Sequence, residues 1–167
     1  MSKFCEYPEN NVDEIIPGLW LGDEISSYNE TFLKQHNIKY IIRVLPETDQ
    51  ARKYDYVTYI HLPIKDESMC QKDLNNLFEK VNYLIKNIIT NKCKVLVHCK
   101  RGHHRSAAFV AAFLIRYLHL SFRQAVRHIN KIRPCALRRD TCMTKALYNY
   151  YILLASLKSS SNKSELI

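Results

Sequence analysis

Short apolar runs alternate along the chain with longer segments in which apolar residues recur every three or four positions. The short runs are rich in Ile, Val, Leu and Tyr, which is typical of strands buried on both faces of a sheet. Two of them flank the turn-forming pair Pro17-Gly18. The predicted strands cover residues 15–16, 19–22, 40–45, 57–64 and 94–97.

The longer segments predict helices. Ser121 followed by Gln124 forms a capping box, and the helix that it opens must end before Pro134. The other predicted helices cover residues 29–35, a segment that begins at 73, 106–118 and 141–157. Strands that alternate with helices predict an α/β fold in which helices flank a mostly parallel central sheet.

The pattern predicts one domain over residues 13–157. Residues 1–12 are polar without a period and are expected to form a flexible arm. Residues 158–167 are Ser-rich and low in complexity, so we expect a disordered tail. The 47% hydrophobic and 25% charged content fits a globular protein, and no apolar run is long enough for a transmembrane segment.

Net charge and cysteine content suggest partners and a compartment. A formal charge of +9 favours anionic partners: phosphorylated protein, inositol phosphate, RNA or an acidic membrane. The N-terminus carries no signal-peptide pattern, so we expect a cytoplasmic protein with reduced thiols, the nucleus or a virion being alternatives. The sequence assigns no role to five of the cysteines, and it does not give the oligomeric state. These cysteines are Cys5, Cys70, Cys93, Cys135 and Cys142.

One strand runs directly into a loop with candidate chemistry, His98 to Ser106, and a helix follows the loop. Backbone N–H groups in such a turn can converge on a phosphate, and the helix N-terminus favours its negative charge. Arg105 offers a planar fork for two phosphate oxygens, and the same positive field favours the Cys99 thiolate. Gly102 permits a positive φ in the loop, and Ser106 can hydrogen-bond the Cys99 sulfur.

The motif His-Cys-x-x-Gly-x-x-Arg-Ser at 98–106 resembles the signature of the dual-specificity branch of the protein tyrosine phosphatase superfamily. The resemblance extends from residue 15 to Pro134 and implies the fold of that family. It further implies that Cys99 is the nucleophile, that Arg105 binds phosphate in the transition state, and that Ser106 assists the thiolate as leaving group. His98 is expected to orient the loop and tune the cysteine.

An aspartate about thirty residues before the cysteine protonates the leaving oxygen in that family. Asp66 follows a predicted strand and matches this position, with Glu67 and Asp73 as competitors. The resemblance implies two steps: attack by Cys99 to give a cysteinyl-phosphate, then hydrolysis by water that Asp66 deprotonates. It implies no metal and no other cofactor. Phosphotyrosine and phosphoserine/threonine of proteins are the expected substrates.

The loop is unusually basic, which leaves other substrates open. The expected substrate-binding residues are Lys100, Arg101, Gly102, His103, His104 and Arg105. This composition also resembles plant and fungal atypical phosphatases that act on inositol pyrophosphates, and Arg138-Arg139 could extend the basic rim. A polyphosphorylated small molecule or an RNA 5′-phosphate is therefore the alternative substrate.

Three other interpretations are weaker. A zinc site of His98, Cys99, His103 and His104 would crowd all its ligands into one stretch, whereas structural zinc usually draws ligands from separated pairs. Low-molecular-weight phosphatases share the Cys-to-Arg spacing but place it near the N-terminus. A catalytically inactive relative that only binds phosphorylated partners would not need Cys99, Arg105, Ser106 and Asp66 together.

After Arg133-Pro134 the family often continues with an Asn-x-x-Phe-type support for the loop, which this chain lacks.

Overall fold

The computed structural model describes residues 11–46, 53–65, 73–138 and 140–164, with side chains up to residue 159. Strands and helices alternate along most of this chain. The strands are β1 (Val12–Ile16), β2 (Leu19–Gly22), β3 (Ile38–Val44), β4 (Thr58–Leu62) and β5 (Lys94–His98). The helices are the short η1 (Ser26–Tyr28), α1 (Glu30–Gln35), α2 (Asn75–Thr90), α3 (Arg105–Tyr117), α4 (Phe122–Ile132) and α5 (Cys142–Ser164).

The five strands form one sheet in the order β1-β2-β5-β3-β4. Only the β1–β2 hairpin is antiparallel; the other neighbouring pairs are parallel. Gly22 of β2 and Arg43 of β3 lie in register with His98 of β5, so three parallel strands end beside one another. The predicted α/β class with a mostly parallel central sheet is confirmed.

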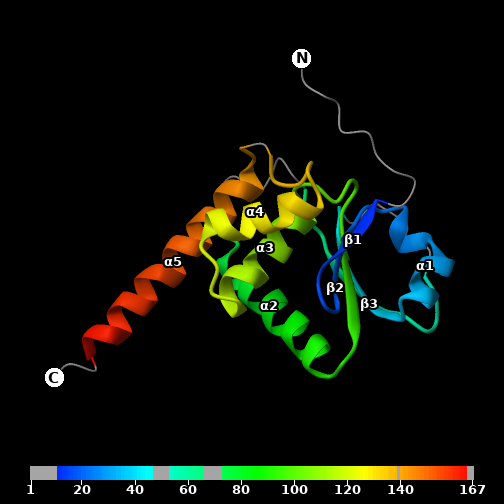
Figure 1. Cartoon of the computed structure of the whole chain (residues 1–167), viewed down its shortest axis with the longest axis horizontal. Helices are drawn as coiled ribbons and strands as arrows, with labels where there is room; N and C mark the ends of the chain where they lie inside the picture. Colours follow the sequence, from blue (N-terminus) through cyan, green and yellow to red (C-terminus); the bar gives the residue numbers. More distant parts are fainter. Residues whose placement is uncertain (1–10, 47–52, 66–72, 139, 165–167) are drawn as a thin grey trace, which may run out of the picture.

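Helices cover both faces of the sheet (Figure 1). Helix α1 lies on one face, where Phe32 and Leu33 pack with Trp20 and Ile41. Helices α2, α3 and α4 lie on the other side, and α5 forms an outer layer against α3. Because α3 is enclosed by the sheet and three helices, ten of its thirteen residues are buried. Its N-terminus is thereby fixed relative to the end of β5.

A partly buried polar network joins α5 to α2 and α3. The Tyr150 hydroxyl donates to Glu79 Oε1 at 2.6 Å and accepts from Asn82 Nδ2 at 3.1 Å. Arg116 Nε donates to the same Glu79 carboxylate at 3.1 Å. Burial first, and then the hydrogen bond to Glu79, raises the pKa of Tyr150. The hydroxyl therefore stays neutral and fixes how α5 docks on the core.

Local signals explain where the elements begin and end. Both hydrogen bonds of the capping box between Ser121 and Gln124 form at the start of α4, and Asn29 caps α1. Strand β4 stops at Leu62, before the end predicted at residue 64, because Pro63 has no N–H to donate to the ladder. The predicted strands and helices are all present, with ends shifted by a few residues.

Two expectations are wrong. The last helix does not end at residue 157: α5 continues to Ser164, so the expected disordered tail is helical over 158–164. Neither Gly nor Pro interrupts this stretch.

The expectation of reduced thiols is wrong for two cysteines: Cys135 and Cys142 are disulfide-bonded, whereas Cys93 and Cys99 are free thiols. Disulfides require cysteines that meet in space, which spacing along the chain does not reveal. Cys5 and Cys70 lie outside the described residues.

No helix within the described part of the chain combines the length and apolar character needed to cross a bilayer.

Candidate active site

Cys99 lies at the floor of a pocket formed by the turn from β5 into α3. Its side chain is buried, and Ser106 Oγ, in the first turn of α3, donates to Cys99 Sγ at 3.2 Å. The pocket has a volume of about 230 Å³. It is lined by Cys99, Lys100, Arg101, His103, His104 and Arg105. The structure thus brings together the predicted nucleophile, its predicted hydroxyl partner and most of the predicted phosphate-binding loop.

The first turn of α3 supplies the positive end of the pocket. The helix begins at Arg105, so the backbone N–H groups of its first turn and the positive end of its dipole lie beside Cys99. Arg105 Nη1 donates to the carbonyl oxygen of Ile64 at 3.2 Å. This bond ties the guanidinium to the segment that follows β4. An anion bound in the pocket next to Cys99 would contact the Arg105 guanidinium and several backbone N–H donors.

Gly102 allows the loop to pack against the end of β2. Its φ is +67°, and a Cβ at this position would lie 2.5 Å from the carbonyl oxygen of Gly22 and 2.8 Å from Arg133 Nη2. Both the backbone conformation and the space therefore require glycine. The predicted positive φ is confirmed, and the close approach to β2 is a second reason that the sequence did not reveal.

Arg133 supports the loop from beneath, a role that sequence reasoning missed. Its buried guanidinium donates to Asp13 Oδ2 at 2.7 Å and to Asn11 Oδ1 at 2.5 Å. Just beyond it, Leu137 N donates to the carbonyl oxygen of His103 at 2.8 Å. The segment after Arg133 thus holds the loop through its backbone, although the usual Asn-x-x-Phe-type sequence is missing.

Glu24 is a second residue that sequence reasoning missed. Its carboxylate accepts from Lys100 Nζ at 2.5 Å and from the Tyr28 hydroxyl at 2.8 Å, and the buried Arg43 lies 3.8 Å away. Burial alone would raise the pKa of Glu24, but its hydrogen bonds to Lys100 and Tyr28 and these two cations hold the pKa below its ordinary value. The carboxylate of Glu24 therefore partly neutralises the positive charge of Lys100. Glu24 comes from a loop distant in sequence, and no motif marks it.

Two histidines of the site are buried and neutral near pH 7. Burial lowers the pKa of His98 to about 4, and the nearby Arg43 contributes in the same direction. The pKa of His103 is also lowered to about 4, by burial first and then by Arg133 and His104. His103 therefore adds little positive charge to the pocket.

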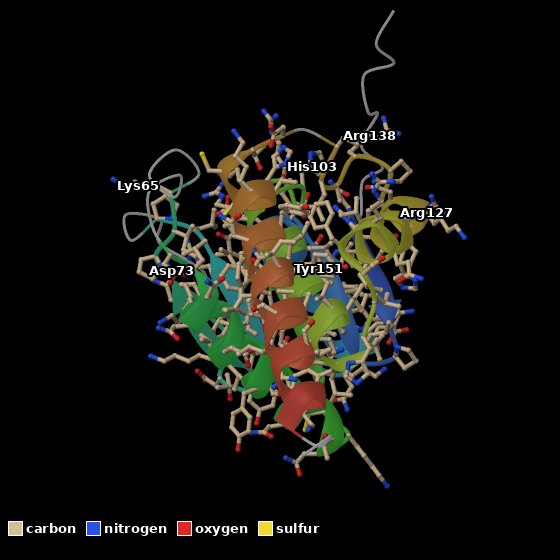
Figure 2. The ribbon with its side chains drawn as sticks, turned by 90° about the vertical axis from the view of Figure 1, so that its left-hand side faces the viewer. Lys65, Asp73, His103, Arg127, Arg138 and Tyr151 are labelled. Atoms are coloured by element: carbon tan, nitrogen blue, oxygen red, sulfur yellow. The ribbon has the colours of Figure 1, made fainter. Side chains whose placement is uncertain are left out.

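The remaining predicted site residues have different outcomes. Asp66 and Glu67 lie outside the described residues, as does Arg139. Asp73 Oδ1 accepts from Asn75 N at 2.8 Å at the start of α2, so this competitor of Asp66 has a capping role. Figure 2 shows Lys65, His103 and Arg138 toward the same end of the molecule.

The zinc alternative finds no support in this geometry. Within the described ranges, no three His, Cys, Asp or Glu side chains converge as ligands for a metal ion.

Burial of neutral His98 predicts a pH-dependent stability. The unfolded chain binds a proton at this histidine near pH 6.5, whereas the folded chain does so only near pH 4. Stability must therefore fall as the pH decreases through this window, by on the order of 3 kcal/mol from His98. We expect His98→Gln to reduce the difference between unfolding free energies measured in urea at about pH 7 and about pH 4.5.

The exposed His119 provides the matched control, and His119→Asn should retain the wild-type pH dependence. If His98→Gln and wild type lose the same stability on acidification, burial of neutral His98 is not the cause.

Comparison with known proteins agrees with this geometry. The family model of the dual specificity phosphatase catalytic domain matches residues 19–152. A Dictyostelium discoideum protein named "probable dual specificity protein phosphatase" is 29% identical over 84% of this chain and 63% of its own length. Human dual specificity protein phosphatase 7 is 32% identical over 71% of this chain. The chain spans only 28% of that human relative.

Solved structures show the same fold. The human tyrosine phosphatase-like serine/threonine/tyrosine-interacting protein superposes with a TM-score of 0.76 and 26% identity. The match covers 86% of this chain and 97% of that protein. The family model spans well over half of the chain and includes the whole turn from Cys99 to Ser106. The chain therefore belongs to the dual specificity phosphatase family.

Proposed function

We propose that the protein is a cysteine-dependent phosphatase that hydrolyses phosphotyrosine and phosphoserine/threonine in proteins through a cysteinyl-phosphate. One observation carries the proposal: the Ser106 hydroxyl donates to the Cys99 sulfur at the floor of the pocket, where α3 begins. A hydroxyl in this position stabilises the sulfur as a thiolate, both as nucleophile and as leaving group. The family supports the same chemistry.

In the first step, the Cys99 thiolate attacks phosphorus opposite the leaving oxygen. The S–P bond forms as the P–O bond to the substrate breaks, and the leaving oxygen takes a proton from a general acid. Arg105 and the N–H groups of the loop stabilise the charge on the three remaining oxygens. In the second step, water attacks phosphorus, the S–P bond breaks, and Ser106 assists the departing thiolate.

Asp66 is our candidate for the general acid and base. Ile64, two residues before it, is buried and accepts a hydrogen bond from Arg105, so the chain that leads to Asp66 is anchored at the pocket. Asp66 would protonate the leaving oxygen in the first step and deprotonate water in the second.

The charge of the pocket favours protein substrates over polyphosphorylated small molecules. Lys100 is paired with Glu24, and burial keeps His103 neutral. The loop therefore presents less free positive charge than its sequence suggests. A phosphate ester on a peptide needs only Arg105 and the backbone donors.

Replacement of the nucleophile tests the reaction. We expect Cys99→Ser to reduce release of nitrophenol from nitrophenyl phosphate by roughly a thousand-fold or more, because the hydroxyl is a far poorer nucleophile than the thiolate. Cys93→Ser, at the only other free thiol among the described residues, is the control and should keep wild-type activity. No activity of the wild type at mildly acidic pH would instead indicate a phosphate-binding module.

Removal of the general acid tests Asp66 separately. We expect Asp66→Asn to reduce kcat on a phosphotyrosyl peptide by about a hundred-fold or more and to alter the pH–rate profile. Asp73→Asn, which removes the carboxylate but keeps an oxygen that can accept from Asn75 N, should leave kcat near wild type. A larger loss in Asp73→Asn than in Asp66→Asn would assign the proton transfer to Asp73 and contradict the role of Asp66.

The substrate class is tested by direct comparison. We expect kcat/KM on a phosphotyrosyl peptide to exceed that on an inositol pyrophosphate or on RNA with a 5′-phosphate. The paired Lys100 and the neutral His103 are the physical reason. A preference of orders of magnitude for the inositol pyrophosphate or the RNA would contradict the protein-phosphatase assignment while retaining the cysteine mechanism.

A further inference from the structure

The positive charge of the protein is concentrated in its C-terminal part. The whole chain has 25 Lys and Arg against 16 Asp and Glu. Residues 121–164 hold nine of the basic residues and a single acidic one, Asp140. The rest of the chain is almost balanced. Such asymmetry indicates that this part meets an anionic partner, and it lies outside the catalytic loop.

The same part of the chain exposes large apolar side chains. Helix α5 buries Met143, Leu147 and Tyr150 against the core. Its other side exposes Tyr148 and Ile152, with about half of each side chain accessible, and its far end exposes Leu157. Figure 2 shows α5 as the outermost element on this side. The outer side of α5 therefore offers large apolar side chains, beside the polar Asn149 and Ser156, for a second contact besides the core.

Basic side chains surround these apolar ones. Neither α4 nor α5 contains an acidic residue. The exposed cations of the two helices are Arg123, Arg127, Lys131, Lys145 and Lys158. Lys145 lies 3.7 Å from the exposed Asp140, and Lys158 lies 3.3 Å from His119. In Figure 2, α4 flanks α5 and carries Arg127 at the edge of the view.

A pocket beside α5 adds a polar recess to this surface. It has a volume of about 260 Å³ and lies where α5 meets the connection between α3 and α4. Arg116, His119 and Lys158 line it together with Tyr151 and Leu154. Arg116 is paired with Glu79, so the pocket combines one paired cation with two further basic groups and an apolar wall. Such a recess can accept the phosphate of a lipid headgroup.

These features favour one kind of partner. A second copy of the chain would bring together two surfaces whose helices carry cations and no acidic residue, which like-charge repulsion opposes. RNA would use the cations but would leave Ile152 and Leu157 exposed. An anionic bilayer can contact both the cations and the exposed apolar side chains, because apolar side chains enter the acyl boundary while lysines reach the headgroups. We propose that the outer side of α5, flanked by the basic face of α4, docks on an anionic lipid bilayer.

Vesicle co-sedimentation of the whole protein tests this surface. We expect binding to phosphatidylcholine vesicles that contain about a quarter phosphatidylserine, and little binding to pure phosphatidylcholine. Binding should weaken as salt increases, because salt screens the charges. Equal binding to both kinds of vesicle, or binding to neither, would overturn the proposal.

Matched variants locate the surface. Ile152→Asn should weaken vesicle binding about ten-fold, whereas Ile25→Asn, an even more exposed isoleucine in the loop after β2, should not. The pair Lys145→Gln and Lys158→Gln should weaken binding about five-fold for each lysine. Lys34→Gln with Lys39→Gln makes the same charge change on α1 and β3. Equal losses in test and control variants would overturn the assignment.

Two further measurements test whether the lipid binds in the catalytic pocket instead, and whether RNA is the true ligand of the α5 surface. Arg105→Met, which removes the phosphate-binding guanidinium of the pocket around Cys99, should leave vesicle binding unchanged; a loss of binding would place the lipid there instead. Binding to single-stranded RNA that exceeds binding to the vesicles and survives Ile152→Asn would assign the face to nucleic acid. Neither measurement requires hydrolysis, so this test stands apart from that of the phosphatase reaction.

Discussion

The contact between the Cys99–Arg105 turn and the end of β2 is the constraint on which the active site depends. Gly102 lies so close to the Gly22 carbonyl and to Arg133 that no side chain fits between them. Arg133 is itself held by Asp13 and Asn11, so the hairpin at the start of the chain braces a loop near its middle. This bracing aligns Cys99 with the N-terminus of the buried helix α3, where thiolate and phosphate are both stabilised.

The electrostatics of the site follow from burial more than from composition. Six of the residues between 98 and 105 are basic, yet Lys100 is paired with Glu24, and His98 and His103 are neutral near pH 7. Positive charge in the pocket is thus carried mainly by Arg101, Arg105 and the helix terminus, close to where the transition state carries its negative charge. The free excess of positive charge lies elsewhere, on α4 and α5, so catalysis and surface attraction use different parts of the fold.

The elements and the reacting residues could be predicted because they depend on local patterns. The β-branched runs, the capping box at Ser121 and the spacing from Cys99 to Ser106 are readable along the chain. Arg133 and Glu24 were missed because each acts across more than seventy residues, on Asp13 and on Lys100. The helical tail and the disulfide-bonded Cys135 and Cys142 were missed because low complexity and cysteine spacing do not report tertiary contacts.

The phosphocysteine itself offers the most direct test of the mechanism. Wild-type and Ser106→Ala protein can be quenched in acid during turnover of a phosphotyrosyl peptide, digested, and examined by mass spectrometry. We expect one phosphoryl group on the peptide that contains Cys99, at higher occupancy in Ser106→Ala because the thiolate then leaves more slowly. Continued turnover with no phosphoryl group on Cys99 in either protein would contradict a reaction through this residue.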